Sequence, residues 1–324
     1  NVIGGSSIRG GRDGDFITVG LQLQSSYVSG DLGSDSLVFL GAVLQSSVFG
    51  GSLQDTTADG SDSLYFASGA TQAFIQGNAG SDTINIAGAV AQSTVWGGAD
   101  ADSISLASGG SQVILEGQNG NDTLHLVGGF RQVTVQGGSG NNYFTVGGSY
   151  AESSVYGGSD ADTLLINTTA ANSSSAFVAG GGNDSITIAI AGGTVLGGAS
   201  IGDTNAGNDT LFVGAVTDAV IDAGSGNNYI TNSGAIKATS IYSGSGNDTF
   251  LQLGSFDTSR FASGAGNDSL IFDGTQTSGS VINAGAGNDT LTFAAAISSV
   301  SIVGGLGDDS ISLSSTTYSV TAAV

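Results

Sequence analysis

Regularly spaced aspartates are the residues of this sequence that could do chemistry. Each closes a glycine-rich hexapeptide, such as GGLGDD over residues 304–309. We call these closing positions the anchors. Nine of the fourteen spacings between successive anchors are 20 residues, so the pattern marks an internal repeat. The anchors are Asp15, Asp35, Asp62, Asp82, Asp102, Asp122, Asn142, Asp162, Asp184, Asp209, Asn228, Asp248, Asp268, Asp289 and Asp309.

A stacked repeat would bring these carboxylates close together. Two like charges 4.8 Å apart repel by about 0.9 kcal/mol even in water, so a row of carboxylates favours cations between them. Calcium takes six to eight oxygen ligands from carboxylates and carbonyls, which two stacked turns can supply together. We therefore predict several Ca²⁺ ions, bound by the Asp anchors and by the carbonyls of turn residues such as Gly246, Gly266, Gly287 and Gly307.

The position two residues before the anchor is Gly in most turns and Asp in three. Both residue types tolerate a positive φ, so we expect a left-handed conformation there. The three aspartates, Asp13, Asp100 and Asp160, are further candidate metal ligands. The alternative is that each anchor only accepts hydrogen bonds from its own turn backbone. That role fits one turn better than a row of repelling charges.

Apolar residues define the elements that position the turns. The second residue after every anchor is apolar, and so is the fourth, except at Asn232 and Gln252. Another apolar position lies seven residues before most anchors, as at Val95. Alternation with period two predicts strands with one buried face. We predict an all-β, right-handed parallel β-solenoid of about 15 coils, with two strands per coil. It would run continuously over residues 1–324, with loops inserted at 52–58 and 200–204.

Composition excludes several classes of partner. The chain has 27 acidic and 5 basic residues, so nucleic acid and anionic lipid are poor partners. It has no Cys, which excludes thiolate metal sites and leaves oxygen ligands for a hard cation. No apolar run is long enough to cross a membrane.

The turns resemble the Gly-Gly-x-Gly-x-Asp-x-apolar-x nonapeptide of the RTX, or haemolysin-type, calcium-binding family. The resemblance covers nearly the whole chain. It implies a right-handed β-roll with calcium between consecutive turns, in a protein exported from bacteria, usually by type I secretion. It also extends, through composition, to surface-layer and sheath proteins.

The opposite edge of each coil departs from that family. A coil of the family has a calcium turn at both edges, whereas segment 127–132 has no anchor carboxylate. We therefore expect calcium along one edge only, with weak or empty sites beside Asn142 and Asn228. Side chains at one position of the opposite edge could hydrogen-bond along the axis or serve only as soluble turn residues. They are Gln45, Gln72, Gln92, Gln112, Gln132 and Glu152.

Catalysis has little support in the sequence. His125, the only histidine, lies between two leucines on a predicted strand and should point outward. A catalytic triad or zinc site needs more partners, so we predict no enzyme.

The functional prediction is an extracellular calcium-binding structural protein of the bacterial cell surface, such as a surface layer, sheath, filament or adhesin stalk. Self-association is the expected partnership, and a cell-surface polysaccharide is a further candidate partner. The alternative is a calcium-dependent secretion and folding domain of an exported enzyme or toxin.

Overall fold

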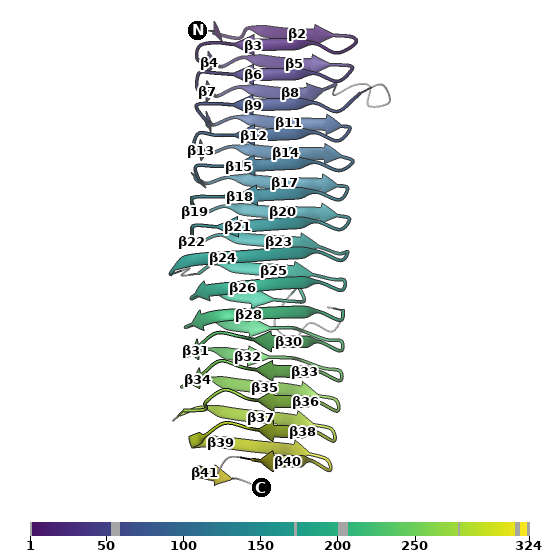
Figure 1. Ribbon diagram of the computed structural model, residues 1–324. Coiled ribbons are helices and arrows are strands. Elements are labelled where there is room, and N and C mark those ends of the chain that lie inside the picture. Colours follow the sequence, from purple (N-terminus) through teal and green to yellow (C-terminus); the bar gives the residue numbers. More distant parts are fainter. Residues whose placement is uncertain are drawn as a thin grey trace. The chain divides into compact units, whose positions relative to one another are not determined.

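The computed structural model describes residues 2–52, 59–171, 174–199, 207–277, 279–314 and 318–322. These residues form strands and turns without a helix, and hence no helix that could span a membrane. They divide into two compact units, Asn1–Ser159 and Asp160–Val324, which we describe separately. Each unit is a right-handed parallel β-solenoid, as predicted (Figure 1).

A coil of the first unit contains three strands. In one coil, β11 (Phe74–Ala79) is followed by β12 (Thr83–Ile86) and the short β13 (Val90–Ala91). The glycine-rich turn joins the first strand to the second, at what we call the anchor edge. The third strand lies at the opposite edge.

Equivalent strands of the first unit stack in three parallel ladders. The first strands are β2 (Ser7–Gly11), β5 (Tyr27–Asp31), β8 (Ser47–Gly51), β11, β14 (Thr94–Ala99), β17 (Ile114–Asn119), β20 (Thr134–Ser139) and β23 (Ser154–Gly158). The second strands are β3 (Phe16–Val19), β6 (Ser36–Phe39), β9 (Ser63–Phe66), β12, β15 (Ser103–Leu106), β18 (Thr123–Leu126) and β21 (Tyr143–Gly147). The third strands are β1 (Val2–Ile3), β4 (Leu23–Gln24), β7 (Val43–Leu44), β10 (Ala70–Thr71), β13, β16 (Gly110–Ser111), β19 (Gly129–Arg131) and β22 (Ser149–Ala151).

The second unit repeats this plan, and its second strands β24 (Thr163–Ala171), β26 (Ser185–Ala191) and β28 (Thr210–Thr217) are longer than those of the first unit. The first strands are β25 (Ala176–Gly180), β27 (Thr194–Leu196), β29 (Val220–Asp222), β32 (Ser240–Tyr242), β35 (Arg260–Ala265), β37 (Val281–Ala286), β39 (Ile297–Leu306) and β41 (Tyr318–Ala322). The second strands are β24, β26, β28, β30 (Tyr229–Asn232), β33 (Thr249–Gln252), β36 (Ser269–Phe272), β38 (Thr290–Phe293) and β40 (Ser310–Leu313). The separate third strands are β31 (Ile236–Lys237) and β34 (Phe256–Asp257).

The third strand corrects the prediction of two strands per coil. Segment 127–132, which the sequence marks only by its lack of an anchor carboxylate, contains β19 and buries the side chain of Phe130. Tyr150 of β22 is buried at the same position, one coil later. The opposite edge therefore contributes its own row of side chains to the core.

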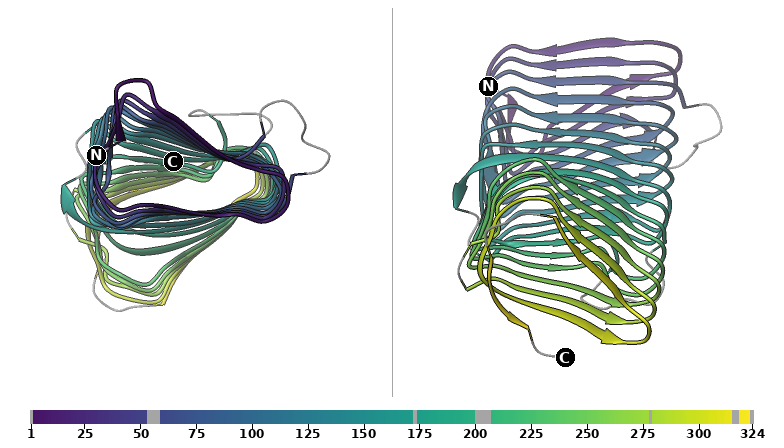
Figure 2. Two further views of the ribbon diagram at one scale, coloured as in Figure 1. Left: turned by 90° about the horizontal axis from the view of Figure 1, so that it is seen from above. Right: turned by 60° about the horizontal axis from the view of Figure 1, so that its bottom comes forward.

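The register matches the repeat. Ile84 pairs with Ile104, and Ile104 pairs with Leu124, so residues two after each anchor stack directly on one another. All three side chains are fully buried. Viewed along the stacking direction, successive coils of each unit overlie one another around this interior (Figure 2).

Buried amides replace apolar side chains in part of the second unit. Asn232 and Gln252, the two exceptions in the apolar pattern, are fully buried. The Asn232 amide donates to the carbonyl oxygens of Val213 and Gly214, and the Gln276 amide donates to Gln252 Oε1 at 2.7 Å. Hydrogen bonds therefore allow these polar groups inside the core.

Removing one ring from the core of the first unit should destabilise it strongly. Phe39 is fully buried and stacks on Phe66 with ring centroids 4.8 Å apart. Phe39→Ala is expected to lower the free energy of unfolding by about 3–5 kcal/mol in urea titrations, because it leaves a cavity. The matched control is Phe16→Ala, since Phe16 is 74 % exposed and its loss should change stability by less than about 0.5 kcal/mol. Equal effects of the two variants would contradict this core assignment.

Candidate metal centre

Most anchor carboxylates accept a hydrogen bond from the coil before them. Oδ1 of Asp82 accepts a hydrogen bond from the backbone N–H of Asp62 at 2.7 Å, and Oδ1 of Asp102 accepts one from Asp82 at 2.8 Å. The same bond recurs in the second unit, as from Asp248 to Asp268 Oδ1 at 2.8 Å. The structural role that we had weighed as the alternative therefore exists, but it links successive coils rather than closing a single turn.

The second carboxylate oxygen is buried without a partner. Asp82 is only 1 % exposed, and its Oδ2 has no hydrogen-bond donor. A buried charged oxygen without a donor or cation is costly. Twelve anchors share this feature: Asp15, Asp35, Asp62, Asp82, Asp102, Asp122, Asp162, Asp184, Asp209, Asp248, Asp268 and Asp289.

The two Asn anchors reveal what surrounds that second oxygen. In Asn142 the side-chain nitrogen donates to the carbonyl oxygen of Gly140 at 2.9 Å. In Asn228 it donates to Ser243 O of the next coil at 2.9 Å and to Gly226 O of its own turn at 3.3 Å. Carbonyl oxygens thus converge on this atom of the anchor. An amide nitrogen suits them, whereas a carboxylate oxygen at the same place needs a proton or a cation between itself and the carbonyls.

The first glycine of the turn allows two oxygen atoms to approach it closely. A Cβ atom added to Gly77 would lie 2.1 Å from Asp82 Oδ2 and 2.6 Å from the carbonyl oxygen of Gly97 in the next coil. The corresponding distances at Gly30 are 2.2 Å, to Asp35 Oδ2, and 2.4 Å. A side chain at this position would displace both oxygens, so glycine is what lets the anchor oxygen and the carbonyl of the next coil approach the turn.

The predicted left-handed position is confirmed. Gly266 has a φ of 132° and Gly287 one of 138°, while Asp100 has a φ of 74°. A Cβ atom at Gly266 would also lie 1.9 Å from the carbonyl oxygen of Gly246, so close stacking requires glycine there. The sequence did not reveal a second left-handed position two residues earlier, where Asn78 has a φ of 89°.

The set of oxygens fits a calcium ion. Besides Oδ2, each ion could take the carbonyls of the second and fourth residues before the anchor, as Asn228 shows with Gly226 and Gly224, and one carbonyl from the next coil. Within the described segments, no three acidic or histidine side chains gather at one point. Backbone carbonyls must therefore supply most of the ligands, as calcium allows.

Residues 279–295, which contain the Asp289 turn, match the family described as RTX calcium-binding nonapeptide repeat (4 copies). This segment carries an RTX-type calcium-binding repeat. No curated protein sequence matches the chain significantly. A solved structure, a TibC-catalysed hyper-glycosylated fragment of TibA, is 13 % identical, with a TM-score of 0.38 over 95 % of this chain and 99 % of that one.

The remaining predicted ligands differ in how far they are exposed to solvent. Asp13, Asp100 and Asp160 are exposed at the anchor edge, outside the buried row, and their metal binding stays a prediction. Asp309 is half-buried, and its Oδ1 accepts the backbone N–H of Asp289 at 3.0 Å. The predicted loop 200–204 and residues 53–58 of the other loop lie outside the described residues.

Asparagines before the anchors have a different role in the RTX turns. The backbone N–H of Asn267 donates to Asn247 Oδ1 at 2.7 Å, and that of Asn288 donates to Asn267 Oδ1 at 2.7 Å. These bonds run in the direction opposite to those of the anchors. The Asn of the Gly-Asn-Asp segment therefore links successive exposed turns by hydrogen bonds, a role that we had not predicted.

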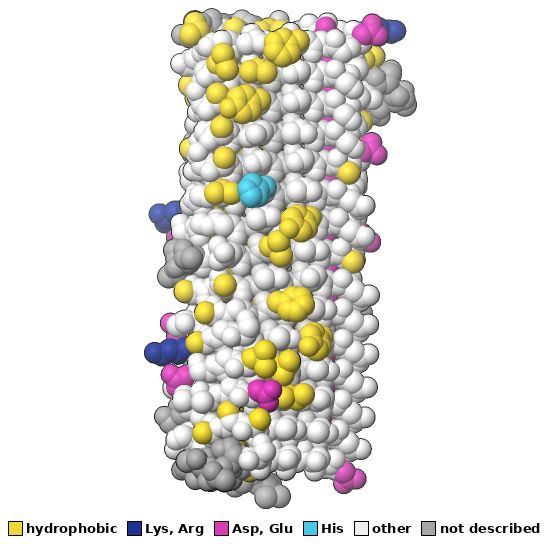
Figure 3. All heavy atoms as spheres, in the orientation of Figure 1, with side chains coloured by type: hydrophobic (Ala, Val, Ile, Leu, Met, Phe, Trp, Pro, Cys, Tyr) yellow, Lys and Arg dark blue, Asp and Glu magenta, His cyan; other side chains and the backbone are white. Residues whose placement is uncertain are grey.

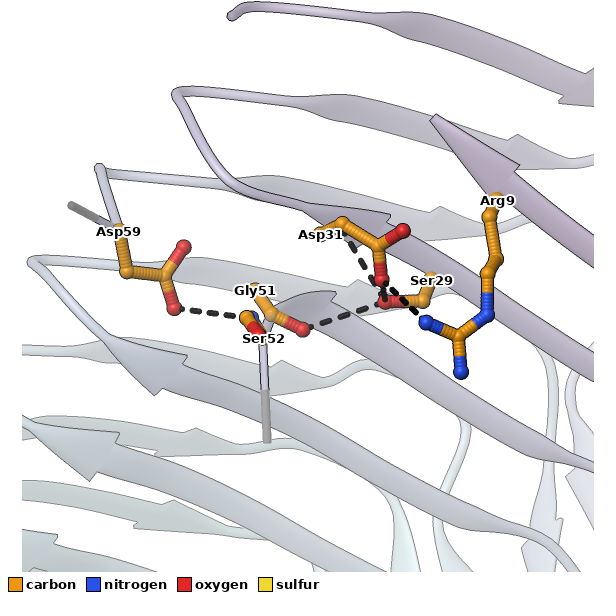
Figure 4. Close-up of polar contacts among 6 residues, drawn as sticks. All are labelled: Arg9, Ser29, Asp31, Gly51, Ser52 and Asp59. Carbon is orange, nitrogen blue, oxygen red and sulfur yellow. Dashed lines mark hydrogen bonds and ion pairs between the residues drawn. The ribbon is translucent and has the colours of Figure 1, made fainter. Parts of the chain in front are cut away.

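Two further carboxylates near the anchor edge have their own donors (Figure 4). Asp31 Oδ1 accepts from the Ser29 hydroxyl at 2.7 Å and from Arg9 at 3.3 Å. Asp59 accepts the backbone N–H groups of Ser52 and Gly60, each at 3.2 Å. Asp59 therefore joins the two ends of the first inserted loop. Neither carboxylate resembles the anchors, whose second oxygens lack donors.

The opposite edge is held mainly by amide and hydroxyl groups. Gln45 donates to Gln72 Oε1 at 3.1 Å, and Gln132 donates to Glu152 Oε2 at 2.9 Å, so the axial bonds form at these steps. A buried Ser93 hydroxyl accepts the Ala73 N–H at 3.0 Å. Among the described residues, the aspartate oxygens without a donor all belong to the anchor edge, and calcium along that edge alone stays a prediction.

Burial raises the pKa of several anchor carboxyls. The pKa of Asp82 is raised to about 9, and those of Asp62 and Asp102 to about 8, chiefly because desolvation disfavours the charged form. The hydrogen bond to Oδ1 opposes this rise, and neighbouring carboxylates add to it. A charged anchor therefore needs a cation beside it.

These shifts predict how calcium-free protein responds to pH. A pKa above the unfolded value of about 3.8 means that the folded state holds the proton more tightly. The resulting stability is complete below about pH 4 and is lost as the pH rises towards 9. Without calcium, the melting temperature should therefore fall between pH 5 and 9, with calcium suppressing the fall. Circular dichroism in EGTA measures this melting temperature. A melting temperature that rose from pH 5 to 9 would contradict the assignment.

Proposed function

We propose that this chain is an extracellular structural repeat protein, stiffened by calcium ions between successive RTX turns. One observation carries the proposal: twelve buried carboxylate oxygens lack a donor, and the Asn anchors show carbonyl oxygens facing the same place. A cation between those oxygens would replace repulsion by coordination and hold neighbouring coils together.

Calcium dependence also favours a location outside the cell. Calcium modules of extracellular proteins bind with dissociation constants of about 10⁻⁴–10⁻³ M, far above cytosolic levels. A row of buried carboxylates would resist folding where calcium is scarce and favour folding where it is abundant. The net charge of −22 adds general attraction for cations.

We also propose that the chain has no catalytic activity. His125 is exposed on the outward face of β18, among mostly uncharged side chains (Figure 3). Its neighbours on adjacent strands are Ser105 and Thr145, which supply neither an acid nor a base. Association between copies and binding of a cell-surface polysaccharide belong to the same proposal. Sedimentation in calcium, with and without added polysaccharide, tests both.

Folding against free calcium tests the main proposal. Far-ultraviolet circular dichroism of the full chain should show strand signal appearing with a midpoint of about 10⁻⁴–10⁻³ M calcium. Terbium provides a local probe, because Trp96, the only tryptophan, directly precedes Gly97 of an RTX turn. Exciting this indole should sensitise terbium emission, and calcium should quench it by displacement. Full folding in chelator, with no terbium signal, would overturn the proposal.

A further inference from the structure

We infer that part of the second unit replaces calcium with side-chain hydrogen bonds, so that ions concentrate in the first unit. The inference rests on the proposed calcium function. It concerns the steps, which we define as the spaces between one anchor turn and the next. We name each step by its anchor.

Steps of the first unit are open. The turns of its Asp anchors begin with glycine, at Gly10, Gly30, Gly50, Gly77, Gly97 and Gly117. At each, an added Cβ would lie within 2.1–2.5 Å of the orphaned anchor oxygen and 2.4–2.8 Å of a carbonyl oxygen of the next coil. No side-chain donor reaches those carbonyls within the described part of this unit. Each open step therefore combines an orphaned carboxylate oxygen with a carbonyl oxygen that receives no side-chain donor.

Three consecutive steps of the second unit are closed by donors. At the Asn228 step, the anchor amide donates to Ser243 O at 2.9 Å. At the Asp248 step, the Ser243 hydroxyl donates to Ser263 O at 3.2 Å. At the Asp268 step, the Ser263 hydroxyl donates to Ala284 O. These acceptors occupy the same turn position as Gly97 O, which in the first unit faces the orphaned oxygen of Asp82.

The serine hydroxyls occupy the space beside the carboxyl group. Ser243 and Ser263 begin their turns, and both are fully buried. Ser243 has a side chain where the first-unit turns have glycine, and its hydroxyl donates to the Ser263 carbonyl oxygen at 3.2 Å. A side chain in that space leaves less room for an ion and supplies the carbonyl with a proton instead.

The closed steps should therefore bind calcium less tightly and stay ordered without it. Because a solenoid gains stability from neighbouring coils, these steps would form an ordered segment in calcium-free protein. The open steps would lose order first, since their like charges then face one another without cations.

Hydrogen exchange of the full chain, with calcium and with EGTA, tests the inference. Amides of the Asp62, Asp82 and Asp102 turns should lose at least tenfold protection in EGTA, whereas those of the Asn228, Asp248 and Asp268 turns should change less than threefold. Equal losses in both sets would overturn the inference while leaving the calcium function intact. If no turn depended on calcium, the proposed function itself would fail.

Variants of one serine separate the hydroxyl from the space that it fills. Ser243→Gly should convert the Asp248 step into an open one, which loses protection in EGTA and regains it in calcium. Ser243→Ala should lose protection in EGTA and regain less, because the methyl group stays. The control is Ser245→Gly, an exposed residue of the same turn, which adds equal backbone freedom. If Ser243→Gly matched this control in both buffers, the hydroxyl would have no such role.

Discussion

Removing calcium from the full chain with a chelator is expected to lower its thermal unfolding midpoint. The expected fall is about 5–10 °C for each calcium site that was saturated before chelation. At a calcium concentration a hundred times the dissociation constant, one bound ion stabilises the folded state by about 2.7 kcal/mol. Each kcal/mol shifts the midpoint by about 2–4 °C in domains of this size. Six open steps in the first unit make the summed loss large enough to unfold it at moderate temperature.

Differential scanning calorimetry in calcium and in EGTA measures this effect. Magnesium at the same concentration is the control, because it prefers octahedral sites at about 2.0–2.1 Å and retains its waters. We expect magnesium to restore little of the stability. An unchanged midpoint in EGTA would mean that the orphaned carboxylates are satisfied by protons alone.

Asp82→Asn is expected to stabilise the folded protein without calcium and to destabilise it with calcium. In EGTA the new amide should donate to turn carbonyls, as Asn142 and Asn228 do, and raise the stability by about 1–3 kcal/mol. In calcium the same variant should lose one ion and become less stable than the wild type. The removed group is a buried carboxylate with an orphaned oxygen, which explains both effects.

Asp82→Ala is the matched comparison. It removes Oδ1 as well, and so leaves the Asp62 N–H without its acceptor. An unsatisfied buried donor costs about 1–3 kcal/mol, and we expect that loss in both buffers. Urea unfolding of the three proteins, each with calcium and with EGTA, provides the six values needed. If Asn and Ala destabilised equally in EGTA, carbonyls would not surround the anchor side chain.

The regular parts of the fold could be predicted because the repeat enforces them. A strand stacked on copies of itself keeps most of its inward side chains apolar from coil to coil, and Ile84, Ile104 and Leu124 show this directly. The same periodicity located the anchors, and glycine at positions such as Gly266 indicated the left-handed turn. These features depend on residue type at a fixed spacing, which a sequence displays.

The third strand could not be predicted, because its core position does not repeat a residue type. Its core position changes from Val90 to Gly110 to Phe130 in successive coils, so no residue type repeats. Strands of two or three residues are also too short for a visible alternation. The amide cluster at Asn232 and Gln252 was visible as an exception, but its burial depends on partners elsewhere in the coil.

The candidate site was predictable in position and only partly in chemistry. The sequence indicated which carboxylates share an edge. It did not show that one oxygen of each is already bound to the preceding coil, or that the other faces carbonyls. It also could not show that Ser243 and Ser263 act as donors, because a serine that begins a turn resembles any other turn residue until its hydroxyl is placed.

A crystal structure of the full chain grown in calcium would test the central claim most directly. We predict an ion at each open step of the first unit, bound to the second carboxylate oxygen of the anchor and a carbonyl of the next coil. At the Asp82 step, both Asp82 Oδ2 and Gly97 O should lie about 2.3–2.6 Å from the ion. Coils that stack as described here, with no density between those oxygens at saturating calcium, would contradict the account.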